Sequence, residues 1–180
     1  AGGLAVADVL FGDFNPSGKI PVTFYKNTDQ LPDFEDYSMK NRTYRYMTEV
    51  PLFPFGYGLS YTTFDISKGR LNKKTISAGQ DLNFKVNVKN TGKYDGAEVI
   101  QVYVRKVDDA EGPIKSLRAF RRVPLKAGET CVVSIDLLPT TFEFFDPTTN
   151  TMRIMPGKYE IMYGNSSDIP SGNKLSVTLR

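Results

Sequence analysis

Hydrophobic and polar residues alternate along most of the chain after position 64. A period of two residues is typical of a strand that buries one face, and turn residues such as Gly92 and Pro156 separate one run from the next. About seven or eight strands over roughly 115 residues predict an all-β, antiparallel sandwich with Phe84, Val133 and Ile135 in its core. The alternating apolar positions are Leu82, Phe84, Val86 and Val88; Ile100, Val102 and Val104; Cys131, Val133, Ile135 and Leu137; Tyr159, Ile161 and Tyr163; and Leu175, Val177 and Leu179.

Three shorter runs complete the predicted sandwich. Leu117 and Phe120 belong to a short strand that should end before Pro124. Residues 142–145 form another, which ends at the turn of residues 146–147, and residues 152–154 form the third. These runs are too short to show their period clearly, so they are assigned from their β-forming residues and the turns beside them.

The first 25 residues follow a different pattern. Four apolar residues have the spacing of one helix face: Leu4, Ala7, Leu10 and Phe11. Gly12 is a stop signal, turn formers fill residues 13–19, and a β-rich run covers residues 20–25. One helix and one strand cannot make two packed layers, so we interpret this unit as the end of an α/β domain. Because the chain begins with alanine directly before the helix, we expect the polypeptide to continue upstream.

No period persists from residue 26 to residue 64. The segment is rich in aromatic residues and proline, which indicates a long ordered loop packed on another surface rather than a flexible tether. Before Phe64 there are 5 basic and 7 acidic residues, and from Phe64 on there are 18 and 13, so the net charge changes from −2 to +5. We therefore predict two parts, residues 1–64 and residues 65–180.

Composition excludes several classes of function. No apolar run approaches the ~18–20 residues of a membrane-spanning helix, and the net charge of +3 comes from dispersed lysines and arginines, so we expect neither a membrane nor a nucleic acid as partner. Histidine is absent, which removes the commonest general base and metal ligand. The single cysteine, Cys131, lies in a predicted strand and is interpreted as a buried structural thiol.

Two short patterns are weak. Asp108, Asp109 and Glu111 could offer oxygen ligands to calcium, but the alternating ligands and sharp glycine of a calcium loop are missing, which favours a solvated loop. The glycines at 56 and 58 lack the third glycine of a nucleotide-binding fingerprint and indicate a turn. We therefore predict no metal and no cofactor.

Carboxylates cluster among aromatic and arginine residues in the irregular segment. Asp33, Glu35 and Asp36 lie close in sequence to Phe34, Tyr37, Arg42, Tyr44, Arg45 and Tyr46. Sugar hydrolysis requires two carboxyl groups across the scissile bond, and sugar rings bind to such polar groups and flat apolar faces. The alternative is an interdomain loop whose charges pair with one another, which composition alone favours.

Three motifs carry a resemblance to a known family. Residues 7–24 read ADVLFGDFNPSGKIPVTF, residues 41–46 read NRTYRY, and residues 51–64 read PLFPFGYGLSYTTF. In this order they resemble the closing segment of the α/β-sandwich domain of family 3 glycoside hydrolases, the β-glucosidases and β-xylosidases, and the landmarks that follow it. Residues 96–104 (GAEVIQVYV) and 117–123 (LRAFRRV) resemble the fibronectin type III-like, immunoglobulin-like domain that ends many members.

The resemblance implies a chain without a complete active site. The family's nucleophilic aspartate lies on an N-terminal barrel and its general acid usually lies in the body of the α/β-sandwich domain, so both would precede residue 1. An intact parent would remove terminal β-linked glucose or xylose by a retaining mechanism. It would be periplasmic or secreted, and this chain would support its catalytic domains, which would be the chain's partners. Oligosaccharide would be a partner of the intact enzyme only.

Candidate residues at the rim of the substrate site are Asp36, Arg42, Tyr44 and Arg45, and no catalytic residue is predicted. Many β-glucosidases of the family have Glu-Gly and Gly-Tyr-Arg where this chain has residues 36–39 and 41–46. The latter run is closer to the xylosidase or arabinofuranosidase side, while glucosidase and dual specificity stay open.

Two alternatives from other classes also stay open, a carbohydrate-binding module and a spacer. The absence of tryptophan argues against the former. Residues 1–25 should expose apolar surface, and self-association through them is the outcome that we expect.

Overall fold

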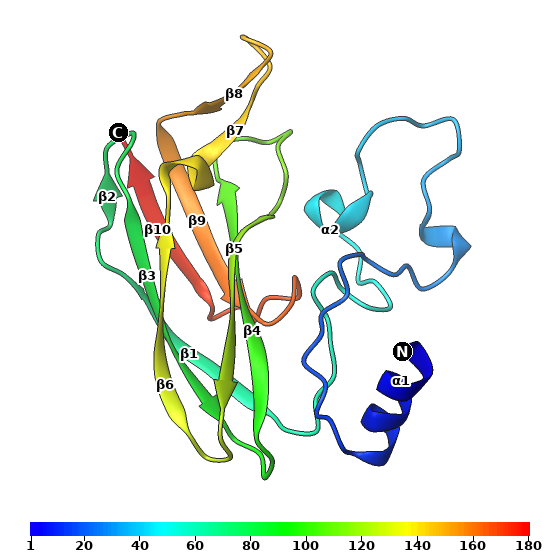
Figure 1. The fold of residues 1–180 in the computed structure, drawn as a ribbon. Coiled ribbons are helices and arrows are strands. Elements are labelled where there is room, and N and C mark those ends of the chain that lie inside the picture. Colours follow the sequence, from blue (N-terminus) through cyan, green and yellow to red (C-terminus); the bar gives the residue numbers. More distant parts are fainter.

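A computed structural model describes all residues, 1–180, and shows a β-sandwich with an N-terminal segment packed beside it (Figure 1). One sheet has the order β1-β3-β6, and the other has the order β2-β10-β9-β4-β5. All pairings are antiparallel except the short one between β10 and β2. The strands of the first sheet are β1 (Phe64–Leu71), β3 (Leu82–Asn90) and β6 (Thr130–Leu137); those of the second are β2 (Thr75–Ile76), β4 (Gly96–Lys106), β5 (Ser116–Leu125), β9 (Gly157–Gly164) and β10 (Lys174–Leu179).

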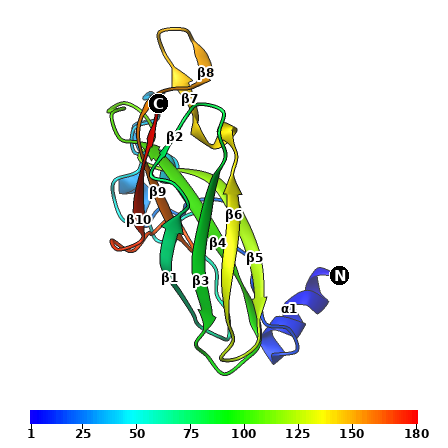
Figure 2. The ribbon, with the colours of Figure 1, turned by 90° about the vertical axis from the view of Figure 1, so that its left-hand side faces the viewer.

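A hairpin extends beyond one end of the sandwich (Figures 1 and 2). It consists of β7 (Glu143–Asp146) and β8 (Thr151–Ile154) and follows the 3-10 helix η2 (Pro139–Phe142). The N-terminal part contains the remaining helices: α1 (Gly2–Phe11), the 3-10 helix η1 (Thr28–Gln30) and the single-turn α2 (Thr43–Tyr46). The chain is therefore mainly β with a helix at its N-terminus, as predicted.

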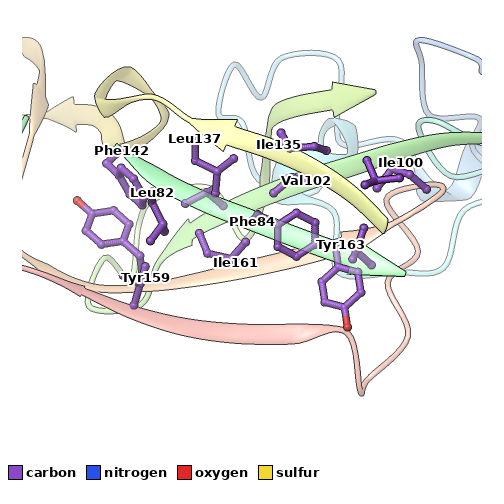
Figure 3. Packing of buried hydrophobic residues seen from close by; sticks show 14 of the residues in the cluster. Leu82, Phe84, Ile100, Val102, Ile135, Leu137, Phe142, Tyr159, Ile161 and Tyr163 are labelled. Atoms are coloured by element: carbon purple, nitrogen blue, oxygen red, sulfur yellow. The ribbon is translucent and has the colours of Figure 1, made fainter. Parts of the chain in front are cut away.

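The core lies between the two sheets, where the alternation placed it (Figure 3). Phe84 is fully buried, and Val133 and Ile135 are buried beside it, which confirms the three core residues predicted from the sequence. The Phe84 ring packs 5.1 Å from the Tyr163 ring, centroid to centroid, and so joins the two sheets. Cys131 is only half-buried against this core as a free thiol, and burial raises its pKa. A raised thiol pKa agrees with a structural role.

Strand β1 was not predicted, because a bulge interrupts its pattern. Ser67 pairs with Asn87 and Arg70 with Lys85, which leaves two residues of β1 opposite one residue of β3. Gly69 lies in this bulge, and its amide donates to the Tyr163 hydroxyl at 3.0 Å. A Cβ at Gly69 would lie 2.4 Å from the Tyr163 ring, so the bulge requires glycine.

Strand β5 is longer than the sequence predicts. It continues through Pro124, which pairs with Ala97, to Leu125. Proline is tolerated because β5 is the edge strand of its sheet and needs hydrogen bonds on one side only. The prediction that the strand would end before Pro124 is therefore wrong.

The N-terminal helix is confirmed, but the strand predicted at residues 20–25 does not form. Helix α1 ends at Gly12. The run that follows makes only an isolated antiparallel bridge between Phe24 and Phe53, while Ile20 exchanges backbone hydrogen bonds with Tyr57 and Gly56. Extended residues become a strand only beside a continuous partner, and here the neighbouring backbone is irregular and proline-rich.

Apolar side chains of residues 1–25 are exposed, as predicted. No residue of α1 is buried, and Leu10 and Phe11 are 74% and 84% exposed. Figure 2 shows α1 standing away from the sandwich. None of the helices combines the length and the apolar composition that crossing a membrane requires.

Candidate functional site

Residues 15–62, here called the docking segment, pack against the outer face of the five-stranded sheet (Figure 1). The outward side chains of β4 are consequently buried, although an outer face usually meets water. Gln101 and Tyr103 are only 3% and 0% exposed. Strand β4 is thus buried on both faces, and polar side chains connect it to the docking segment.

Gln101 is the centre of this interface. Its Nε2 donates to the carbonyl of Gly56 at 3.0 Å and to the carbonyl of Asn165 at 2.6 Å, and its Oε1 accepts from the Tyr103 hydroxyl at 2.6 Å. Burial raises the pKa of Tyr103, so this hydroxyl stays protonated and donates. Gly56 has a φ of 77°, and a Cβ there would lie 2.1 Å from the Gln101 side chain. The backbone of the docking segment therefore approaches β4 as closely as a glycine permits.

A buried ion pair forms a second connection. Lys19 Nζ lies 2.6 Å from Glu98 Oε1, and both side chains are nearly inaccessible. The other oxygen of Glu98 accepts from the Asn165 side chain at 3.0 Å, and the Val99 amide donates to Oε1 at 2.7 Å. A buried carboxylate requires this many partners, and loss of one partner would leave an uncompensated charge.

Tyr44 and Arg45, two of the predicted rim residues, lie in this interface. The Tyr44 ring stacks on Phe55, with centroids 4.2 Å apart, and its hydroxyl accepts from the amide of Leu117 at 3.1 Å. The carbonyl of Arg45 accepts from the amide of Ile114 at 2.8 Å. Both residues of α2 therefore attach the docking segment to the edge strand β5 and the loop before it.

Asp36 and Arg42, the other two predicted rim residues, lie in an exposed loop at residues 33–42. Arg42 Nε donates to the carbonyl of Ser38 at 2.9 Å, and Nη2 donates to the carbonyl of Asp36, so one guanidinium closes the loop. The amide and hydroxyl of Ser38 donate to the Asp36 carboxylate and hold its pKa below the usual value, with Arg42 adding a smaller effect. Phe34 and Tyr37 are 93% and 90% exposed on this loop.

A cavity of about 580 Å³ lies between residues 44–54 and the sandwich. Charges of both signs line it, including Arg105, Lys115, Glu160 and Asp168. Burial lowers the pKa of Lys115, while Asp168 opposes this effect, and Lys115 Nζ donates to the carbonyl of Ser167 at 2.6 Å. Glu160 Oε2 lies 3.9 Å from Lys174 Nζ, so Lys115 and Glu160 are both engaged with other groups of the protein.

The acidic loop at residues 108–111 makes contacts within the protein. Asp108 pairs with Lys106 at 3.5 Å, and Asp109 accepts from the amide of Gly112 at 2.9 Å. No group of three or more acidic, histidine or cysteine side chains is arranged to hold a metal ion.

Sequence reasoning missed Glu98 and Gln101. The signal was present, because both are long polar residues within an otherwise apolar strand, GAEVIQVYV. A polar side chain on a fully buried strand requires hydrogen-bond partners, and here they include Lys19, Gly56 and Asn165. These partners lie far from Glu98 and Gln101 in the sequence, so the pattern of residues alone does not identify them.

A β-sandwich with seven main strands in two sheets, held to a preceding segment by buried polar contacts, defines a fibronectin type III-like module. The family model described as fibronectin type III-like domain matches residues 98–167, and the model of the glycosyl hydrolase family 3 C-terminal domain matches residues 1–61. The chain belongs to glycoside hydrolase family 3 and corresponds to the C-terminal region of its members.

Relatives agree with this assignment. The chain is 55% identical to the xylan 1,4-beta-xylosidase of Xylanibacter ruminicola over 99% of its own length and 20% of the relative's. It is 38% identical to the periplasmic beta-glucosidase of Salmonella typhimurium, over 92% of the chain and 23% of the relative. The chain thus spans between a fifth and a quarter of these relatives.

Solved structures show the same arrangement. A β-glucosidase from Erythrobacter marinus has a TM-score of 0.83 and 38% identity, covering 99% of this chain and 24% of that one. The β-glucosidase from Listeria innocua in complex with isofagomine has a TM-score of 0.80 and 32% identity, covering 99% and 26%. The likeness covers nearly the whole chain, so it includes the docking segment as well as the sandwich.

Proposed function

We propose that the chain is a non-catalytic structural part of a longer glycoside hydrolase, in which it holds the fibronectin type III-like sandwich rigidly against the end of an α/β domain. The observation that carries this proposal is the buried network of Gln101, Tyr103 and Gly56 together with the Lys19–Glu98 ion pair. Buried polar networks whose members all have partners make an interface rigid. We place the division between the two parts at residues 64 and 65, and the start of β1 at Phe64 supports this position.

The intact enzyme hydrolyses terminal, non-reducing β-D-glycosides with retention of configuration, through a covalent glycosyl intermediate. A xyloside is favoured as substrate, because identity to the xylan 1,4-beta-xylosidase is 55% and identity to the periplasmic beta-glucosidase is 38%. The latter protein's periplasmic description also supports a periplasmic or secreted location. The catalytic domains of the same polypeptide are the chain's partners.

Within that enzyme, the loop at residues 33–42 lies at the rim of the substrate site. Asp36 and Arg42 belong to this exposed loop, while Tyr44 and Arg45 fix its base to the sandwich. The Asp36 carboxylate can accept hydrogen bonds from sugar hydroxyls, and the hydrogen bonds from Ser38, which lower its pKa, favour the ionised form. The four residues would act on substrate positioning rather than on bond cleavage.

The first experiment assays the purified chain with p-nitrophenyl β-xyloside and β-glucoside. No turnover above a heat-killed control is expected, since neither the nucleophile nor the general acid is on this chain. Xylan and cello-oligosaccharides titrated against the same protein should show no binding. Turnover would refute the non-catalytic role, and saturable binding would favour a carbohydrate-binding module.

The second experiment uses the full-length enzyme that carries this chain. Asp36→Asn and Arg42→Lys should lower kcat/KM while the thermal midpoint stays unchanged, because the loop is exposed. Glu35→Gln, on the same loop, is the matched control. Unchanged kinetics in both variants would remove the loop from the substrate site and leave the structural role standing.

A further inference from the structure

Lys115 is a half-buried lysine on the wall of the cavity between residues 44–54 and the sandwich. The volume of this cavity, about 580 Å³, falls within the range of about 300–1,000 Å³ that is typical of small-molecule sites. Ser167, whose carbonyl accepts from Lys115 Nζ at 2.6 Å, belongs to the same wall. Asp168 and Lys174, whose charges act on the amine, line the cavity as well. The amine end of Lys115 therefore lies among residues that face the cavity.

The backbone holds this amine in place from two sides. The amide of Ser167 donates to the carbonyl of Phe55 at 2.8 Å, so the residue that accepts from Lys115 is fixed to the docking segment. The amide of Ile114, the residue before Lys115, donates to the carbonyl of Arg45 at 2.8 Å. The hydrogen bond to Ser167 uses one hydrogen of the amine. An uncharged Lys115 amine would therefore keep its lone pair free for a reaction in the cavity.

The surroundings of Lys115 favour this uncharged form. Burial lowers the pKa of Lys115, while the negative charge of Asp168 opposes this effect and the positive charge of Lys174 adds to it. A lower pKa leaves a larger fraction of the amine uncharged at neutral pH. Uncharged lysine amines in such surroundings act as nucleophiles towards carbonyl carbons and form Schiff bases. The cavity thus offers a nucleophile to a carbonyl compound.

The other charged groups of the cavity indicate a neutral ligand with hydroxyl groups. Three cationic and three anionic residues line it: Arg105, Lys115, Lys174, Glu49, Glu160 and Asp168. A charged ligand would meet like charges there as well as opposite ones. Arg105 takes part in none of the four ion pairs of the chain, so its guanidinium can donate to hydroxyl oxygens, and the exposed Asp168 carboxylate can accept from hydroxyl groups.

We propose that Lys115 is a covalent binding site for a small polyhydroxylated aldehyde, such as the open-chain form of a short sugar. The lone pair of Nζ adds to the aldehyde carbon, and a carbon–nitrogen double bond then forms. Both hydrogens of the amine leave with the carbonyl oxygen as one molecule of water, so no oxidant or reductant is required. Protonation of the imine restores a hydrogen that the Ser167 carbonyl can accept. This site goes beyond the structural role proposed above and does not depend on it.

The test labels the 180-residue chain with D-glyceraldehyde and sodium cyanoborohydride, which reduces an imine to a stable secondary amine. Peptide mapping by mass spectrometry measures the labelling rate of each lysine. Lys115 should be labelled several-fold faster than Lys126, an exposed lysine just after β5 and a control within the same molecule. The rate at Lys115 should level off as the glyceraldehyde concentration rises, because the ligand occupies the cavity before it reacts. This rate should also reach half its maximum at a lower pH than that of N-α-acetyllysine amide, because burial lowers the pKa of Lys115.

Two variants connect the labelling to the cavity. Lys115→Arg should abolish the fast labelling, since a guanidinium is always charged. Asp168→Asn removes the charge that opposes the lowered pKa, so it should speed up labelling of Lys115 at neutral pH without changing the thermal midpoint. Glu111→Gln, at another exposed acidic residue, is the matched control and should leave the rate unchanged.

The measurements on the wild-type chain decide the proposal even if a variant fails to fold. The proposal is overturned if Lys126 is labelled as fast as Lys115, or if the rate at Lys115 rises in strict proportion to the glyceraldehyde concentration. A rate at Lys115 that Asp168→Asn leaves unchanged or lowers would also overturn it.

Discussion

Replacing Gln101 by leucine tests the network that joins the docking segment to the sandwich. The change removes one acceptor and two donated hydrogen bonds, and leaves the carbonyls of Gly56 and Asn165 and the hydroxyl of Tyr103 without partners. Each buried group left unpaired costs about 1–3 kcal/mol. Because leucine regains part of this through its apolar surface, Gln101→Leu should lower the free energy of unfolding by about 3–6 kcal/mol.

Urea denaturation followed by circular dichroism measures this loss, and hydrogen exchange localises it. The amide of Gly56, which donates to the carbonyl of Ile20, should exchange faster in the variant. Gln80→Leu is the control, since Gln80 is exposed in a turn and its loss should change stability by less than about 1 kcal/mol. Tyr103→Phe in the Gln101→Leu background should restore about 1 kcal/mol, because one unpaired hydroxyl disappears. A loss below about 1 kcal/mol for Gln101→Leu would refute the reasoning.

Three further predictions concern other parts of the chain. Ile135→Ala should lower the free energy of unfolding by about 2–5 kcal/mol in urea melts, since it empties core volume, whereas exposed Val132→Ala should have little effect. Several hydrogen bonds, first that from the amide of Thr148, lower the pKa of Asp146. The ionised Asp146 carboxylate therefore stabilises the fold fully above the ordinary carboxyl pKa, and this stabilisation is lost as the pH falls through the lowered pKa. Asp146→Asn should therefore flatten the loss of stability below about pH 4, measured by urea midpoints against pH. The chain should self-associate at micromolar concentration in sedimentation velocity, and Phe11→Ser should weaken this, because Phe11 is largely exposed.

Each of these has a contrary outcome. Equal losses for Ile135→Ala and Val132→Ala would show that the core-facing and solvent-facing sides of β6 are wrongly assigned. If stability falls as steeply at low pH in Asp146→Asn as in the wild type, the Asp146 carboxylate does not contribute to the pH dependence of stability. A strictly monomeric chain whose residues 1–25 resist hydrogen exchange would end the argument from exposed apolar surface.

The sandwich was predictable because its main strands bury one face. The alternation in β3 and β6 placed Phe84 and Ile135 correctly without any knowledge of their neighbours. Strand β1 was not predicted because the bulge at Gly69 interrupts the alternation. The requirement for glycine there comes from Tyr163, which is 94 residues away in the sequence. The predicted length of β5 was too short, because proline ends a central strand but is tolerated in an edge strand, and the sequence does not show which of the two β5 is.

The candidate site was predictable in composition and not in location. Carboxylate, arginine and aromatic residues at 33–46 marked a polar loop, but nothing local separates Arg42, which closes the loop, from Tyr44, which stacks on Phe55. The partners that distinguish them come from β5 and from residues 51–58. Glu98 and Gln101 were visible as polar residues in an apolar strand, and their partners are set by tertiary structure alone.

The edges of the five-stranded sheet bear on how copies of this chain can meet. At one edge, Pro124 has no amide hydrogen to offer, and the amide of Leu117 already donates to Tyr44. At the other edge, β2 is only two residues long. A strand from a second molecule would therefore find few free backbone groups at either edge of this sheet. The exposed apolar side chains of α1 offer a different kind of contact, which dissociates on dilution.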